Sequence, residues 1–235
     1  MPENARLQSL DRIGRGSGPG ASVGADKPVL FDPDMIESQH HADPENHSEQ
    51  QRDPWQRPRR LPGDRQPAEE IARMLRVDHA GEYGATRIYQ GQLDVFGRSR
   101  AVGEIRRMAE TEKRHLARFE ELLHQRRVRP TLLYPLWSVA GYALGAATAL
   151  LGESAAMACT VAVEDTIDEH YQGQAEYLAE EDPALRETVL AFRDDELAHR
   201  EIAIAHGAED AFGYGLISAA VKAGSRIAIW LSTRL

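Results

Sequence analysis

Two stretches of the 235-residue sequence decide its fold, MAETEKRHLARFEEL (108–122) and VLAFRDDELAHREIA (189–203). Each contains a Glu-x-x-His pair, Glu112 with His115 in the first and Glu196 with His199 in the second. In a helix, a spacing of three residues places both side chains on one face. Apolar residues continue that face at spacings of three and four, so each pair interrupts an apolar stripe and points toward the core. An unpaired carboxylate there would be very costly.

Each pair also has a glutamate upstream that lies on an apolar helical stripe. Glu82 precedes Glu112 by 30 residues, and Glu164 precedes Glu196 by 32 residues. The sequence therefore predicts two copies of one unit, a helix with an inward Glu followed by a helix with an inward Glu-x-x-His. We expect the repeat to be limited to these functional residues, because the residues around them are not visibly duplicated.

Charge balance indicates what such a core could hold. Four inward carboxylates carry a formal charge of about -4, which two divalent cations would cancel. Four carboxylates and two histidines form the ligand set of ferritin-like bundles with two iron or manganese ions, and such metals suit dioxygen chemistry. The predicted metal ligands, whose four glutamates are also the predicted catalytic residues, are Glu82, Glu112, His115, Glu164, Glu196 and His199.

Local signals predict an all-α fold, a ferritin-like four-helix bundle over residues 67–235. Pro67 suits a helix start, Gly97 and Gly207 suit helix ends, and Asp182-Pro183 separates two helices. The expected helices span about 67–96, 101–126, 150–179 and 182–206. Residues 1–66 hold eight of the twelve prolines and few large apolar side chains, which predicts a disordered tail. We interpret its histidines His40, His41 and His47 as an incidental cluster rather than a metal site.

Composition excludes several classes of protein. With 28 Lys and Arg against 37 Asp and Glu, the formal net charge of -9 argues against nucleic acid as a partner. The single cysteine, Cys159, excludes a disulfide framework and is expected to be a small buried residue. The N-terminal sequence lacks the apolar core of a signal peptide and is too acidic for a mitochondrial transit peptide. This pattern indicates a bacterial-type protein on the cytoplasmic side of the cell membrane.

Two segments predict contact with a membrane surface. Residues 131–152 carry no charge and are long enough to span a bilayer core. A single crossing would separate Glu112 from Glu164, so we predict an apolar crossover between the second and third helices that covers the bundle or lies on the membrane. Residues 211–235 form an extra amphipathic helix whose Lys222, Arg226, Arg234 and Trp230 favour an interfacial position. The alternative for this helix is simple packing on the bundle.

Other polar and small residues near the predicted ligands are secondary candidates. Asp78 and His79 could orient ligands or lie on an exposed helix face. His170 could donate a hydrogen bond into the site, and Tyr171 is expected to pack in the core. Glycines flank Glu82 on both sides and would leave room for substrate or for a close helix; they are Gly81 and Gly84.

Four motifs resemble the demethoxyubiquinone hydroxylase family of ubiquinone biosynthesis over Ile71 to Leu235. They are LRVDHAGEYGA (75–85), RVRPTLLYPLW (127–137), ALLGESAAMACTVAVED (149–165) and FRDDELAHR (192–200). The resemblance implies a di-iron monooxygenase that uses dioxygen to hydroxylate the ring of demethoxyubiquinol. It also implies two ferrous ions on the six residues found by spacing, with Glu112 and Glu196 as bridges. Asp165 departs from the family, in which a second Glu often follows the residue matching Glu164.

The sequence leaves other points open. Electrons would come from an external donor, since the sequence has no glycine-rich dinucleotide fingerprint. Whether the protein forms a homo-oligomer or joins a ubiquinone-biosynthesis complex is not specified. The alternatives to the hydroxylase are another ferritin-like di-iron oxidase and a metal-free helical membrane interaction protein.

Overall fold

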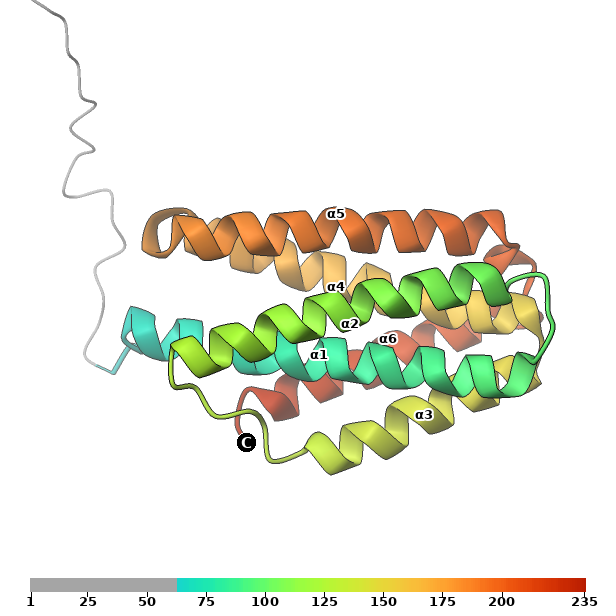
Figure 1. Cartoon of the computed structure of the whole chain (residues 1–235), viewed down its shortest axis with the longest axis horizontal. Helices are drawn as coiled ribbons and strands as arrows, with labels where there is room; N and C mark the ends of the chain where they lie inside the picture. Colours follow the sequence, from blue (N-terminus) through green and yellow to red (C-terminus); the bar gives the residue numbers. More distant parts are fainter. Residues whose placement is uncertain (1–62) are drawn as a thin grey trace, which may run out of the picture. The chain divides into compact units, whose positions relative to one another are not determined.

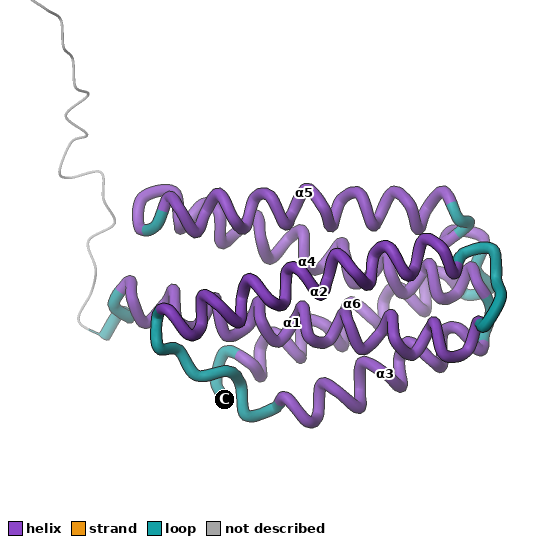
Figure 2. Tube along the Cα trace, in the orientation of Figure 1, coloured by secondary structure: helices purple, strands orange, loops and turns teal. Residues whose placement is uncertain are grey.

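The computed structural model describes residues 63–235, which form helices and no strand (Figures 1 and 2). The elements are α1 (Pro67–Phe96), α2 (Val102–Gln125), α3 (Tyr134–Leu150), α4 (Glu153–Glu181), α5 (Pro183–Ala205), the 3-10 turn η1 (Ala208–Asp210) and α6 (Tyr214–Ser232). The predicted all-α fold is confirmed. The predicted tail lies outside the described residues except for positions 63–66, and so does its histidine cluster.

The four long helices form two hairpins, α1 with α2 and α4 with α5, which face each other as in a ferritin-like bundle. The short turns between their helices make the partners in each hairpin antiparallel (Figure 1). Outside the bundle, α3 packs along α1 and α6 packs along α4. The predicted crossover between the second and third long helices therefore contains a helix of its own.

Local capping explains where the long helices begin and end. The backbone N–H of Gln66 donates to the carboxylate of Glu69 at 3.2 Å, directly before Pro67. Asp182 ends α4 and accepts a hydrogen bond from the backbone N–H of Leu185 at 3.0 Å, which caps α5. The third long helix begins at Glu153, not near residue 150, because Gly152 has a φ of 117° that interrupts the helix.

Two apolar clusters fill the bundle, one toward each end. One cluster contains Leu75, Phe119 and Val189, and the other contains Ile105, Met108, Met157 and Ala203. In each long helix, the predicted ligands fall in the sequence between residues of the two clusters. The carboxylates therefore lie in the middle of the bundle with apolar layers on both sides.

Glycines allow α3 to approach α1 very closely. A Cβ atom added at Gly145 would lie 1.9 Å from the carbonyl oxygen of Ile88, and one at Gly141 would lie 2.8 Å from that of Gly84. From the other side, a Cβ at Gly91 would lie 2.3 Å from the carbonyl oxygen of Tyr142. The crossover therefore packs on the bundle, and its contact with a membrane stays a prediction. Among the helices in residues 63–235, none combines the length and hydrophobicity needed to span a membrane.

Salt bridges hold α6 to α4. Lys222 lies 2.8 Å from Asp165, and Arg226 lies 3.0 Å from Glu169. Two of the three cations expected to face a membrane are therefore paired with carboxylates of the protein. The third, Arg234, lies over the ring of Trp230 at 4.0 Å.

Candidate metal centre

The bundle brings all six predicted ligands together in its core. Each is at most 5% exposed. They form two overlapping groups, and within each group the potential ligand atoms lie within 4.8 Å of one another. The first group is Glu82, Glu112, His115 and Glu196, and the second is Glu112, Glu164, Glu196 and His199. Because Glu112 and Glu196 belong to both groups, they lie where carboxylates could bridge two ions.

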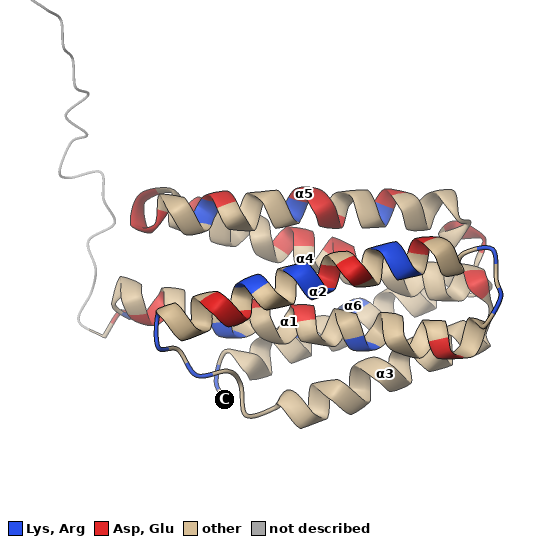
Figure 3. Cartoon of the chain, viewed as in Figure 1, with Lys and Arg blue, Asp and Glu red and all other residues tan. Residues whose placement is uncertain are grey.

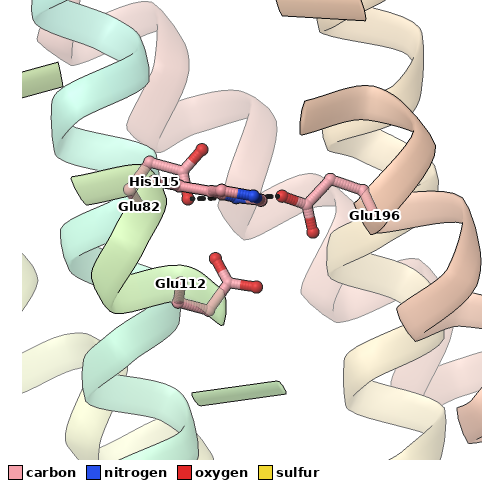
Figure 4. A group of neighbouring side chains, drawn as sticks. All are labelled: Glu82, Glu112, His115 and Glu196. Atoms are coloured by element: carbon pink, nitrogen blue, oxygen red, sulfur yellow. Dashed lines mark hydrogen bonds and ion pairs between the residues drawn. The ribbon is translucent and has the colours of Figure 1, made fainter. Parts of the chain in front are cut away.

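Both histidines direct Nδ1 toward carboxylates. His115 Nδ1 lies 3.1 Å from Glu196 Oε1 and 3.5 Å from Glu82 Oε2, so this ring stands between the two hairpins (Figure 4). His199 Nδ1 lies 3.0 Å from Glu112 Oε1 and 3.1 Å from Glu196 Oε2. The two Glu-x-x-His pairs therefore contribute equivalent atoms to the two groups.

The six buried side chains could bind cations, but they do not satisfy one another's hydrogen-bonding groups. Glu112 Oε2 and Glu164 Oε2 are buried without a hydrogen-bond partner. An unsatisfied buried carboxylate oxygen is rare in native proteins, because its desolvation is not repaid. Oxygen and imidazole ligands in this number are those of ferritin-like dimetal sites. The residues present therefore fit a pair of divalent metal ions.

The pKa values show the same excess of negative charge. Burial and the neighbouring carboxylates raise the pKa of Glu112 and of Glu164 well above the usual range, and burial raises that of Glu196 to about 7. Burial lowers the pKa of His115, but hydrogen bonds to Glu196 and Glu82 outweigh it and raise the pKa to about 10. Without metal, protons on these side chains would compensate the buried charge.

Two tyrosines bind the outer glutamates across the hairpins. Tyr171 on α4 donates its hydroxyl hydrogen to Glu82 Oε1 on α1. Tyr89 on α1 donates to Glu164 Oε1 on α4 at 2.9 Å. Each bond fixes one oxygen of a predicted ligand and leaves the other free for a metal. Tyr171 is thus a core residue, as expected, and a hydrogen-bond donor to the site as well.

The expectation that only the ligands are duplicated is wrong. Residues 82–92, EYGATRIYQGQ, and 164–174, EDTIDEHYQGQ, share a Glu followed seven residues later by the same four residues, YQGQ. The shared Tyr residues are those that bind Glu82 and Glu164 across the bundle. Sequence analysis missed Tyr89 as a site residue, because a tyrosine on an apolar helical stripe is explained by core packing alone. The YQGQ repeat was the signal that could have identified it.

The secondary candidates have mixed outcomes. Asp78 is buried and accepts hydrogen bonds from Gln174 Nε2 at 2.6 Å and from His170 Nε2 at 3.2 Å. His170 therefore binds Asp78, and no hydrogen bond joins it to a ligand carboxylate in the described part of the chain. His79 is buried, so its placement on an exposed helix face is wrong; it lies 4.0 Å from Glu120 and near the ring of Tyr134, and a role in orienting a ligand stays a prediction. Cys159 is fully buried, as expected.

Asp195 is a further site residue that sequence analysis missed. Its Oδ2 lies 3.0 Å from His115 Nε2, the nitrogen that faces away from the carboxylates. Its side chain is 53% exposed. Only its position immediately before Glu196 could have drawn attention to it.

An apolar cavity of about 310 Å³ lies between α1, α3, α4 and α6. Gly81 and Gly84 line it, so the space predicted beside Glu82 is present. Val163, another lining residue, immediately precedes Glu164. The cavity therefore adjoins the segments of α1 and α4 that carry the outer glutamates.

The fold and the buried cluster define a ferritin-like helical bundle whose core could hold metal ions. Comparison with known families identifies the family within this class of protein. The chain belongs to the family of ubiquinone biosynthesis protein COQ7, which matches residues 69–232.

Similar proteins carry names that agree with this family. A 3-demethoxyubiquinol 3-hydroxylase of Rhodospirillum rubrum is 56% identical, over 75% of this chain and 84% of the relative. The mitochondrial NADPH-dependent 3-demethoxyubiquinone 3-hydroxylase of Homo sapiens is 53% identical, over 70% of this chain and 78% of the relative. The mitochondrial 5-demethoxyubiquinone hydroxylase of Saccharomyces cerevisiae is 41% identical over 70% of this chain. The resemblance to demethoxyubiquinone hydroxylases is confirmed.

Proposed function

We propose that this protein is a di-iron monooxygenase that hydroxylates the ring of demethoxyubiquinol with dioxygen. The observation that carries the proposal is the pair of overlapping Glu/His groups that share Glu112 and Glu196. The names of the relatives support the substrate and the reaction. Family membership favours this function over another di-iron oxidase, and the unpartnered carboxylate oxygens favour it over a metal-free protein.

Each ligand has a distinct proposed role. Glu82 and His115 would hold one ferrous ion, and Glu164 and His199 would hold the other, with Glu112 and Glu196 between them. Bound ferrous iron supplies the activation of dioxygen that ring hydroxylation requires. Tyr89 and Tyr171 orient the outer glutamates through their hydroxyl groups. The apolar layers on both sides exclude water from the reacting groups.

The reaction needs more than the protein and its metals supply. Inserting one oxygen atom of dioxygen into a C–H bond leaves the second atom to become water, which consumes two electrons and two protons. These electrons come from an external donor. The human relative is named NADPH-dependent, so NADPH is the first donor to test.

The cavity between α1, α3, α4 and α6 supports an apolar ring substrate. Its wall is formed almost wholly by aliphatic and small residues, including Ala85, Ile88, Leu144 and Ile167. Such a surface favours a ring with an isoprenoid tail over a polar metabolite. We propose that the substrate enters here and that its ring approaches the metals past Gly81.

The function is tested in a strain that lacks this protein. It should accumulate demethoxyubiquinone and lose ubiquinone, and the wild-type chain should restore the product. Glu164→Ala should not restore it, because Asp165 lies about 100° away around the helix and cannot replace the ligand. As a control, Asp168→Asn changes a carboxylate on the same helix outside the metal cluster and should restore the product. Normal ubiquinone in the deletion strain, in the absence of a second hydroxylase, would contradict the assignment.

We also propose that the protein attaches peripherally to a membrane through α3 and α6. Large apolar side chains are exposed on these helices, among them Leu136, Val139, Leu216, Ile227 and Trp230. Figure 3 shows α3 without any charged residue. Burial of this apolar surface, more than the paired cations of α6, would supply the attachment. The cytoplasmic face of a bacterial cell membrane stays a prediction, and the human and yeast relatives are named mitochondrial.

Attachment is measured by sedimentation of the full chain with liposomes. Val139→Asp combined with Leu216→Asp should lower the bound fraction by about tenfold or more, because charge opposes insertion into the interface. Glu187→Lys with Glu201→Lys, exposed on α5, is the control and should not release the protein. Unchanged binding of the double Asp variant would remove this surface from the interface.

A further inference from the structure

The internal repeat relates the two halves of the metal centre residue by residue. Glu112 and His115 each have their counterpart 84 residues later, at Glu196 and His199. By the same shift, the counterpart of Asp195 is Thr111. The carboxylate that binds His115 Nε2 is therefore replaced by a neutral side chain in the other half.

The contacts of the two histidines differ accordingly. His115 Nε2 lies 3.0 Å from Asp195 Oδ2, and the His115 ring stacks on Phe192 with centroids 3.9 Å apart. In residues 63–235, no hydrogen bond to Nε2 of His199 is found. The His199 ring is not stacked in this way; it lies nearly perpendicular to the ring of Tyr89, at a centroid distance of 6.5 Å. Thr111 does not compensate, because its hydroxyl donates to the carbonyl of Arg107 and accepts from Arg114.

We propose that Asp195 is a positioning residue that makes the two metal positions unequal, so that the position of Glu82 and His115 binds divalent metal more tightly than that of Glu164 and His199. Asp195 accepts the Nε2 hydrogen of His115, which leaves the Nδ1 lone pair free for the metal and fixes the ring. A carboxylate behind a ligating imidazole also increases the basicity of the imidazole. This inference rests on the proposed metal site.

Anaerobic titration of the metal-free full chain with Co²⁺ tests the inequality directly. The visible absorption of bound Co²⁺ should reveal two binding events of different affinity in the wild type. His115→Ala should abolish the tighter event, and His199→Ala should abolish the weaker one, which assigns each event to its position. Binding of no Co²⁺ by the wild type would contradict the proposed function itself.

Substitutions at the two related positions then test Asp195. Asp195→Leu should weaken the tighter event by about 10- to 100-fold and leave the weaker event unchanged. Asp195→Asn keeps an acceptor oxygen and should weaken the tighter event less than Asp195→Leu does. The exposed position of Asp195 favours folding of both variants, which circular dichroism would verify.

The reciprocal variant builds the missing carboxylate. Thr111→Asp combined with Arg114→Ala reproduces in α2 the Asp195 and Ala198 of α5, because Arg114 is the counterpart of Ala198. This variant should tighten the weaker event toward the affinity of the other. Two equal events in the wild type, or equal weakening of both events by Asp195→Leu, would overturn the inference.

Discussion

At the scale of the residue, the shared glutamates differ from the outer ones in how many ions depend on them. Glu112 and Glu196 lie within reach of both histidines, whereas Glu82 and Glu164 each belong to one group. The outer glutamates have a tyrosine hydroxyl as a second partner, while Glu112 has none: its Oε2 is without a hydrogen-bond partner and its Oε1 faces His199 Nδ1. Loss of a shared carboxylate should therefore affect both metal positions, and loss of an outer one only its own.

This difference predicts metal content. Glu112→Ala should lower bound iron from about two per chain to almost none, because each position loses a ligand and the centre loses its bridge. Glu82→Ala should retain about one iron, held by Glu164 and His199. Iron per chain is measured by elemental analysis, with Asp168→Asn as a control carboxylate outside the cluster. Full iron occupancy in Glu112→Ala would exclude this residue as a ligand.

The gathering of the six predicted ligands in the core could be predicted from sequence, because charged residues on an apolar stripe have few alternatives to a buried site. The tyrosines could not be separated from core residues in the same way, since a tyrosine fits an apolar stripe without a second role. Asp195 gave no such signal, because carboxylates on exposed positions of a helix are common. Its contact with His115 depends on how α5 is aligned with α2, which only the three-dimensional structure shows.

At the scale of the element, the close contact of α3 with α1 closes one side of the apolar cavity. Gly141 and Leu144 of α3 line the cavity opposite Gly84 and Ile88 of α1. Because the two backbones meet at glycines, a side chain at Gly145 would have to displace backbone atoms and could not simply push aside a flexible side chain. The position of α3 therefore depends on these glycines.

Substitution of Gly145 tests this contact. Gly145→Ala should lower the free energy of unfolding by about 1–3 kcal/mol, as overpacking does in well-packed cores. Gly173→Ala is the matched control, because this helical glycine in α4 has nothing within 4 Å of an added Cβ. It should raise the free energy of unfolding by about 0.5–1 kcal/mol. Urea denaturation of both variants measures the difference, and equal effects would show that α3 can move away at no cost.

The long helices were predictable to within about three residues at each end. Proline, glycine and the capping Asp182 act within a few residues of their own positions, so their effects can be read locally. The start of α4 was placed too early because an apolar run continues through Gly152, whose positive φ is set by the turn. Packing of α3 on α1 was harder to predict, since it brings Gly145 against Ile88 and Gly91 against Tyr142, which are more than fifty residues apart in the sequence.

At the scale of the whole molecule, the metal-free bundle must bury several acidic groups together. Its free energy of unfolding should therefore depend on pH in a direction set by the cluster. A group with a higher pKa in the folded than in the unfolded protein binds more protons when folded, so its contribution to stability is lost as pH rises. Glu196, with a pKa of about 7, and His115, with a pKa of about 10, both behave in this way.

Other shifted groups leave this sign unchanged above pH 6.5. The raised pKa values of Glu112 and Glu164 act in the same direction. Burial lowers the pKa of His199, which acts in the opposite sense, but only as pH falls below the usual value of 6.5. Salt bridges lower the pKa of Asp165, and this shift changes the free energy of unfolding only at acidic pH. From pH 7 to pH 9 the metal-free protein should thus lose stability.

The final prediction compares metal-free and metal-loaded protein over this range. If the folded chain binds one proton more than the unfolded chain, the free energy of unfolding of the metal-free chain should fall by about 1.4 kcal/mol per pH unit between pH 7 and pH 9. Mn²⁺ should flatten or reverse this slope, because metal binds the deprotonated ligands and replaces the protons. Thermal unfolding midpoints at each pH compare the pH dependence of the metal-free and the metal-loaded protein. His115→Gln should flatten the metal-free slope, since it removes the proton held between Glu82 and Glu196. A metal-free midpoint that rises from pH 7 to pH 9 would contradict the proposed charge balance of the core.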